Sequence, residues 1–245
     1  MRVIGLIPAR LDSSRYPKKM ITDLCGKPLI QHTFENAQRC PLLDDLIIAT
    51  DSPLIKDIID SCGGKSYLTS NTHTSGTDRI AEVVQNISAD IVVNIQGDEP
   101  FLSLDDLSSS IQTCIDLKTS IVTLAHPVSH KEASCPNNVK VVLDADGKAL
   151  LFSRSLIPFH RHKEFSTTYL KHIGVYVYPK DLLLKFVSHK PSFLEKTEGL
   201  EQLRALENGI KIHVNLCEKD SLGVDTSEDF ALAKKILKER NRLHD

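Results

Sequence analysis

The chain has 245 residues, of which 41% are hydrophobic and 25% charged, and its formal net charge is −2. These values are typical of one large globular domain, and the absence of a basic excess argues against a general nucleic-acid or membrane-surface binder. Six cysteines are scattered without a CxxC pair, which favours free thiols in a reducing, cytoplasmic compartment. No apolar run approaches the roughly 18 residues of a membrane-spanning helix, so we expect neither a membrane nor a nucleic-acid partner.

The first half of the chain alternates short apolar runs with segments of helical periodicity. The apolar runs predict buried strands at 3–7, 46–50, 91–95 and 121–125. The periodic segments predict helices at 27–40, 53–62, 77–87 and 104–115. Ser52 before Pro53, and Ser103 with Asp106, are typical helix starts. This strand–helix alternation favours a doubly wound α/β fold with a mostly parallel sheet.

The second half of the chain has a different pattern. A hairpin is predicted at 139–152, around the turn Asp144-Ala145-Asp146-Gly147, and the polar segment 160–168 reads as an exposed loop. Strands at 172–178 and 211–216 and helices at 181–188, 197–208 and 225–240 follow. We therefore expect a single domain over residues 1–245, with an inserted antiparallel portion at about 139–195.

The loop after the first strand is unusually basic for an acidic chain. In VIGLIPARLDSSRYPKKM, residues 3–20, the cations Arg10, Arg15, Lys18 and Lys19 are opposed only by Asp12. Ligands of open α/β sheets bind beyond the carboxyl ends of the strands, so Arg10, Arg15 and Lys19 could neutralise a triphosphate. The alternative is a solvated basic turn. Neither GxGxxG nor GxxxxGK[ST] is present, so a nucleotide would need a different loop.

Two acidic residues follow predicted strands or turns. Asp98 ends the strand in VVNIQGDEP, and Asp225 lies in LGVDTSED before the last helix. Two carboxylates that meet over phosphates are what Mg²⁺ prefers. From the residues alone, Asp225 is better explained as the N-cap of the last helix, and Glu99 is a weaker candidate ligand than Asp98.

Motifs along almost the whole chain then point to one family. They are IPARLDSSRYPKKM (7–20), HTSGTDR (73–79), NIQGDEP (94–100), PNNVKVV (136–142), FSRSLIP (152–158), KHIGVYVY (171–178), LEQLR (200–204) and GVDTSED (223–229). In this order they resemble the family of 3-deoxy-manno-octulosonate (Kdo) cytidylyltransferases. The resemblance implies a homodimer that transfers CMP from CTP to Kdo for lipopolysaccharide biosynthesis, with Mg²⁺ as cofactor.

The resemblance also implies roles for individual residues. It assigns catalysis to Arg10, Lys19 and Asp98, and Mg²⁺ binding to Asp98 and Asp225, which reverses the helix-cap interpretation of Asp225. The nucleotide-binding residues that it implies are Pro8, Ala9, Arg10, Arg15, Lys19, Ser75 and Gly76. The sugar-binding residues that it implies are Arg79, Gln96, Arg154, His172, Tyr176, Glu201 and Gln202. Several of these have a plain structural alternative, such as a first-turn helix residue for Arg79 or a solvated helix face for Glu201.

The chain departs from the family pattern in two places. Lys18 and Met20 stand where the family usually has glycine and proline, which indicates an unusual backbone angle or a close approach to phosphate at position 18. Segment 160–168 lacks the usual tryptophan; His160 and His162 within it have no third ligand nearby and are expected to be exposed. Rival functions are a cytidylyltransferase for another acidic sugar, a CTP sensor without catalysis and a dinucleotide-dependent dehydrogenase. The missing glycine fingerprint argues against the last.

Overall fold

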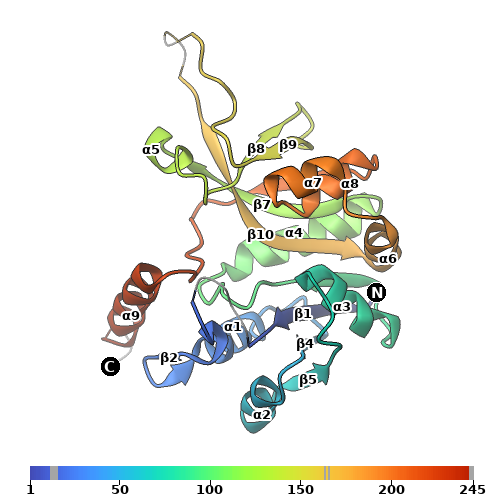
Figure 1. Cartoon of the computed structure of the whole chain (residues 1–245), viewed down its shortest axis with the longest axis vertical. Helices are drawn as coiled ribbons and strands as arrows, with labels where there is room; N and C mark the ends of the chain where they lie inside the picture. Colours follow the sequence, from blue (N-terminus) through green and yellow to red (C-terminus); the bar gives the residue numbers. More distant parts are fainter. Residues whose placement is uncertain (12–15, 163, 165, 243–245) are drawn as a thin grey trace. The chain divides into compact units, whose positions relative to one another are not determined.

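The computed structural model describes residues 1–11, 16–162, 164 and 166–242 (Figure 1). Its packing divides the chain into two units, Met1–Ser108 with Ser221–Asp245, and Ser109–Asp220. The second unit covers more of the chain than the insertion expected at about 139–195. No helix among the described residues has the length and apolar character that crossing a membrane requires.

The first unit is built on a parallel sheet. Its strands are β1 (Val3–Ala9), β4 (Asp45–Thr50), β5 (Lys65–Leu68) and β6 (Ile91–Asn94). Across the unit they run β6-β1-β4-β5, and β1 pairs in parallel with both β4 and β6. The order reverses direction between β1 and β6, which makes the carboxyl ends of these two strands the switch point where ligands bind in such sheets.

Helices cover both faces of this sheet. They are α1 (Leu29–Ala37), α2 (Pro53–Ser61) and α3 (Gly76–Gln85). Helices α1 and α2 contact each other, whereas α3 packs on β1 and β4. From β1 through β4 to β5 the chain moves in one direction across the sheet, and it then returns to β6 on the other side of β1. Since crossovers between parallel strands are right-handed, this reversal places α3 on the face opposite to α1 and α2. The buried side chains Ile30, Ile55 and Val83 show why the helical periodicity was detectable.

The segment between β1 and α1 is short and irregular. It contains the 3-10 turn η1 (Lys19–Ile21) and the two-stranded pair β2 (Asp23–Leu24) and β3 (Lys27–Pro28). Lys18, which precedes η1, has φ 56° and ψ 27°, in the left-handed region that favours glycine. The unusual backbone angle expected at position 18 is therefore present, and the Lys18 side chain is exposed.

The second unit is mainly antiparallel. Its strands are β7 (Ile121–Val128), β8 (Lys140–Leu143), β9 (Ala149–Ser153), β10 (Tyr169–Pro179) and β11 (Ile212–Leu216). Strand β10 pairs antiparallel with β7 and β8, β8 and β9 form the predicted hairpin, and β11 pairs in parallel with β7. The α/β fold class with an antiparallel portion is thus confirmed.

The helices of the second unit correct one prediction. They are α5 (His130–Ala133), α6 (Lys180–Ser188), α7 (Phe193–Glu198) and α8 (Gln202–Glu207). The single helix predicted at 197–208 is wrong, because Gly199 adopts φ 63° and ends α7, and α8 begins only three residues later. Helix α4 (Leu104–Leu117) lies before β7 in the chain. The described residues of segment 160–168 form no helix or strand.

The last helix, α9 (Ser227–Arg242), belongs to the first unit. Its N-terminus is capped by Thr226, whose Oγ1 accepts from the backbone N–H of Asp229 at 3.2 Å. The Asp229 carboxylate in turn accepts from the Thr226 N–H at 2.9 Å. This capping box satisfies the orphan amide groups of the first turn. The backbone therefore begins the helix at Thr226 and leaves the carboxylate of Asp225 for another role.

Candidate active site

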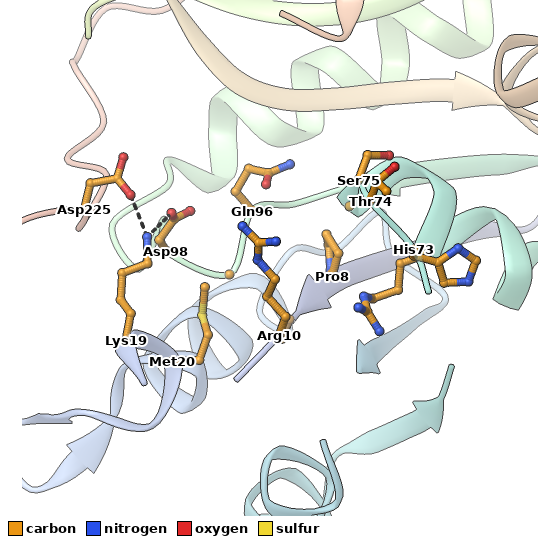
Figure 2. Close-up of a pocket in the computed structure, with 14 residues that line it drawn as sticks. Pro8, Arg10, Lys19, Met20, His73, Thr74, Ser75, Gln96, Asp98 and Asp225 are labelled. Atoms are coloured by element: carbon orange, nitrogen blue, oxygen red, sulfur yellow. Dashed lines mark hydrogen bonds and ion pairs between the residues drawn. The ribbon is translucent and has the colours of Figure 1, made fainter. Parts of the chain in front are cut away.

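A cleft in the first unit opens at the switch point of its sheet (Figure 2). Fourteen described residues line it. Those that the sequence predicted are Pro8, Ala9, Arg10, Lys19, Ser75, Gly76, Arg79, Gln96, Asp98 and Asp225; the others are Met20, His73, Thr74 and Gly97. Arg15 lies outside the described residues. Residues from the ends of β1 and β6 and from the start of α3 thus share one cleft.

Lys19 holds two carboxylates together at one end of this cleft. Its Nζ lies 2.6 Å from Asp98 Oδ2 and 2.6 Å from Asp225 Oδ1, as Figure 2 shows. The lysine is only 5% exposed. Burial lowers the pKa of Lys19, but Asp98 and Asp225 outweigh burial and raise the pKa above its ordinary value. The ammonium is therefore held in its charged form.

The two carboxylates converge because the end of the chain returns to the loop after β6. The backbone N–H of Val224 donates to the Asp98 carbonyl at 2.8 Å, beside Asp225 in the chain. The Ser221 hydroxyl donates to the carboxylate of Glu99, so Glu99 anchors the returning segment. Gly223 packs closely against this carboxylate, since a Cβ at position 223 would lie 3.2 Å from Glu99 Oε1. Glu99 thus supports the site from its side.

Arrangements of this kind suit a magnesium ion. Two carboxylate oxygens that both reach one ammonium nitrogen could reach one cation, and Mg²⁺ typically takes few protein oxygens and completes its octahedron with phosphate and water. The described residues contain no cluster of three or more histidine, cysteine or acidic side chains able to hold a metal. His162 contacts Glu164 at 3.1 Å, and both side chains are exposed. Asp98 and Asp225 therefore fit a metal ion that takes most of its ligands from the phosphates of a bound substrate and from water.

The other end of the cleft is formed by the start of α3. Ser75 caps this helix, and its Oγ accepts from the Asp78 N–H at 3.0 Å. Gly76 packs against Pro8, and a Cβ at position 76 would lie 3.0 Å from Pro8 Cγ. The small residues thus bring the backbone of α3 close to the end of β1. A helix N-terminus offers free N–H groups and a positive dipole end to an anionic or polar ligand.

Arg10, Gln96 and Arg79 line the cleft in different ways. Arg10 is exposed at the end of β1, and Figure 2 shows its guanidinium directed into the cleft near Gln96. Arg79 is 3% exposed, and its Nη2 lies 2.6 Å from Asp51 Oδ2. The Arg79 Nη1 also donates to Thr69 Oγ1 at 2.5 Å. Arg79 thus fastens α3 to the ends of β4 and β5, while its side chain still borders the cleft.

The sequence assigned no role to four residues of the cleft, although it marked Met20 as a departure from the family pattern. Met20 is 8% exposed and packs on Gly97, where an added Cβ would lie 3.0 Å from the Met20 sulfur. His73 Nε2 contacts Glu82 Oε2 at 2.5 Å beside α3. Thr74 precedes the cap of that helix. All four residues lie in the family motifs IPARLDSSRYPKKM, HTSGTDR and NIQGDEP, so these motifs were the available signal for them.

In the second unit, Arg154 is fixed by backbone and acidic groups. Its Nε donates to the Glu198 carbonyl at 2.8 Å, and its backbone N–H donates to the Glu198 carboxylate at 2.9 Å. Lys140, which is completely buried, donates to the carbonyl oxygens of Arg154, Asn138 and Cys135 at 2.6, 2.7 and 3.2 Å. All three protons of the ammonium are thereby used. The segment that carries Arg154 is held rigidly.

His172 and Tyr176 lie on β10 in an aromatic cluster. The His172 ring centroid is 5.4 Å from that of Tyr176 and 5.0 Å from that of Phe152. Burial lowers the pKa of His172 to about 3, so the ring is neutral near pH 7. Burial, with Tyr178 and Glu201 nearby, raises the pKa of Tyr176 well above its ordinary value. Both side chains therefore act as neutral hydrogen-bonding groups.

Glu201 and Gln202 begin helix α8. Glu201 Oε1 lies 3.1 Å from Arg204 Nη2, and Arg204 also contacts Glu195 at 2.8 Å and covers the Phe186 ring. Gln202 is 7% exposed. The second unit thus contains a mixture of cations, neutral aromatic donors and an acid, which suits recognition of hydroxyl and carboxylate groups.

Comparison with known proteins gives a consistent result. Residues 4–212 match the Cytidylyltransferase family. The chain is 44% identical over 252 residues to the 3-deoxy-manno-octulosonate cytidylyltransferase of Trichlorobacter lovleyi, covering 98% of this chain and all of the relative. It is 41% identical over 241 residues to that of Koribacter versatilis, covering 98% of this chain and 92% of the relative. A solved CMP:2-keto-3-deoxy-manno-octonic acid synthetase complexed with CTP matches with a TM-score of 0.94 and 38% identity, covering 98% of this chain and 100% of that one.

Proposed function

The chain belongs to the cytidylyltransferase family, and we propose that it transfers CMP from CTP to the anomeric hydroxyl of Kdo, activating this sugar acid for lipopolysaccharide biosynthesis. In this reaction the hydroxyl loses its proton to solvent, and its oxygen bonds to the α-phosphorus of CTP. The bond from that phosphorus to the bridging oxygen breaks, and pyrophosphate leaves with its electron pair. The observation that carries the proposal is the cleft where Lys19, Asp98 and Asp225 meet beside Arg10 and the start of α3.

The nucleotide is proposed to lie along this cleft. Ser75 and Gly76 bring the N-terminus of α3 close to Pro8, which suits contact with the cytosine or ribose. The Arg10 guanidinium presents a fork for phosphate oxygens, and Lys19 presents a compact charge. Phosphoryl transfer of this kind depends mainly on in-line positioning and on cations where charge builds on the leaving group. Arg10 and Lys19 are therefore proposed as catalytic residues.

Asp98 and Asp225 are proposed to hold Mg²⁺. When bound, the ion would supply positive charge to the phosphates and lower the pKa of the attacking hydroxyl. Lys19 now occupies the position between the two carboxylates, so its ammonium would move aside and become available to the phosphates.

The sugar acid is proposed to contact Arg154, His172, Tyr176, Glu201 and Gln202 in the second unit. A carboxylate ligand needs a cation, and Arg154 offers a guanidinium held at a fixed position by Glu198. His172 and Tyr176 supply neutral polar groups for hydroxyls. Gln96 and Arg79, which the family resemblance also assigns to the sugar, line the cleft of the first unit.

A cytoplasmic homodimer is proposed as the working form. All six cysteines are free, which fits a reducing compartment. The second unit exposes Leu150, Phe159 and Phe193 at 62%, 86% and 76%. An association surface would cover side chains of this kind where they form a contiguous patch. Light scattering in solution would test the dimer, and a monomeric mass at micromolar concentration would reject it.

The test of the activity is pyrophosphate release from CTP and Mg²⁺ in the presence of Kdo, N-acetylneuraminate or no sugar. Release with Kdo alone is expected. Release with the other sugar acid would retain the nucleotide cleft and overturn the sugar contacts. Tight CTP binding without release under any condition would favour a sensor and reject the transferase.

A further inference from the structure

Thr123 lies at an irregularity in the pairing of β7 with β10. The register of these strands shifts between Ile173 and Tyr176. Thr123 is fully buried, and its Oγ1 faces this shift. The hydroxyl oxygen lies 2.7 Å from the Val175 carbonyl, 3.3 Å from the Ile173 carbonyl and 3.0 Å from His172 Nε2. One hydroxyl thus links the irregular backbone to the imidazole ring.

The protons at this junction can be assigned by counting. A hydroxyl has one proton and two lone pairs, and carbonyl oxygens can only accept. The shortest contact, to the Val175 carbonyl, takes the Thr123 proton. The oxygen of Thr123 must then accept from His172, so the proton of the neutral imidazole lies on Nε2. Nδ1 is left with a free lone pair.

Two aromatic rings pack against the His172 ring. Phe152 meets it edge-on at 5.0 Å, and Tyr176 lies tilted against it at 5.4 Å. Among the described residues, no hydrogen bond joins His172 Nδ1 to another group. Burial keeps the pKa of His172 near 3, so a second proton does not fill Nδ1 near pH 7.

We infer that Thr123 is a positioning residue that fixes His172 in the Nε2–H tautomer, so that Nδ1 accepts a hydrogen bond from a hydroxyl of the sugar acid. The inference rests on the proposed contact between His172 and the sugar. An acceptor-only nitrogen selects a donor, and a ligand without that hydroxyl would leave it unpaired. Thr123 therefore contributes to sugar selection without touching the sugar.

The test combines histidine NMR with kinetics of the whole chain. In ¹⁵N-histidine protein, the His172 signals are assigned by their absence in His172→Gln and are expected to show a protonated Nε2 and an unprotonated Nδ1. Thr123→Val keeps the branched shape but removes the hydroxyl, and it should give a mixture of tautomers. The KM for Kdo should rise about five- to tenfold, as expected for one neutral hydrogen bond. The KM for CTP should stay within about twofold, since the nucleotide cleft is untouched.

Two matched variants serve as controls for Thr123→Val. Thr123→Ser retains the hydroxyl and should restore both the NMR signals and the KM for Kdo. Thr113→Val removes a hydroxyl elsewhere in the second unit, one that donates to the Ser109 carbonyl at 2.9 Å, and should leave the His172 signals unchanged. This control separates the specific role of Thr123 from the general loss of a threonine hydroxyl.

Defined results would overturn the inference. A wild-type proton on Nδ1, or unchanged His172 signals in Thr123→Val, would reject the tautomer assignment. An equal rise in both KM values would reject the role in sugar selection. If the wild-type protein releases no pyrophosphate with Kdo, the proposed function fails, whereas the NMR signals still decide whether Thr123 sets the tautomer.

Discussion

Asp225→Asn separates the two roles that this residue could have. The change keeps the size of the side chain and removes its charge, while Lys19 retains Asp98 at 2.6 Å. The Asp225 side chain is 39% exposed, so solvent weakens its ion pair, and the amide oxygen can still accept from Lys19. The expected loss of unfolding free energy is about 1 kcal/mol, which lowers Tm by about 2–4 °C in a chain of this size.

Activity should respond far more strongly than stability. A metal site reduced to one carboxylate should slow pyrophosphate release by at least about 10²–10³ at a Mg²⁺ concentration that saturates the wild type. The assay is initial-rate pyrophosphate release over a Mg²⁺ titration, with thermal unfolding measured on the same samples. Wild-type turnover in Asp225→Asn would refute the assignment.

Asp229→Asn is the matched control for the helix-cap role. The Asp229 carboxylate accepts from the backbone N–H groups of Asp225 and Thr226 at 3.0 and 2.9 Å and takes no part in the contact with Lys19. Weakening this cap should cost about 1 kcal/mol of stability. Turnover should stay within about twofold of wild type. Asp229→Asn could also lose as much turnover as Asp225→Asn. In that case, displacement of the segment before α9 explains the lost turnover in both variants, and a ligand role for Asp225 is unsupported.

Three further changes probe other parts of the chain. Arg154→Ala should raise the KM for Kdo far more than the KM for CTP in steady-state assays, and an equal effect on both would remove Arg154 from the sugar contacts. The backbone of Lys18 has a left-handed conformation, which is strained for lysine but not for glycine. Lys18→Gly should therefore raise the unfolding free energy in denaturant titrations by about 0.5–1 kcal/mol, with activity retained. A lower unfolding free energy would contradict backbone strain at Lys18. The hydroxyl of Ser153 and the Arg154 N–H lower the pKa of Glu198 below 4.5, so its charge stabilises the fold above pH 4.5 and this stabilisation is lost as pH falls through the folded-state pKa. The stability difference between wild type and Glu198→Gln should therefore shrink below pH 4.5, and a difference that grows on acidification would contradict this sign.

Most strands and helices could be predicted because their apolar patterns coincide with burial. Strand β1 is buried at every position, and helix α2 begins at Pro53 with Ser52 as its cap, as its sequence indicated. Strand β5 was not predicted from the sequence. It is the last strand in the order of the sheet, and its residues are only half-buried or exposed, so no apolar run marks it. The break at Gly199 was missed because the apolar side chains Leu200 and Leu203 continue a helical spacing across it.

The candidate site was predictable where it follows from parallel topology. Strands that run the same way place their carboxyl ends at one edge, so Arg10 after β1 and Asp98 after β6 follow strand ends at the same edge. Residues that pack beneath the cleft carry no such signal. Met20 was marked only as a departure from the family pattern, and its contact with Gly97 is seen only in the structure.

The role of Asp225 could not be decided from local sequence, because an acid before a helix suits both a cap and a metal ligand. The distinction depends on two contacts between residues far apart in the chain. Thr226 takes the capping role, which frees the preceding carboxylate, and the Val224 N–H docks on the Asp98 carbonyl, which brings that carboxylate to Lys19. A shift of the cap by one residue would turn Asp225 toward the helix and leave Lys19 with one partner. Helix capping and the contact of Asp225 with Lys19 are therefore coupled at this position, and the order of Asp225 and Thr226 in the chain is what permits both.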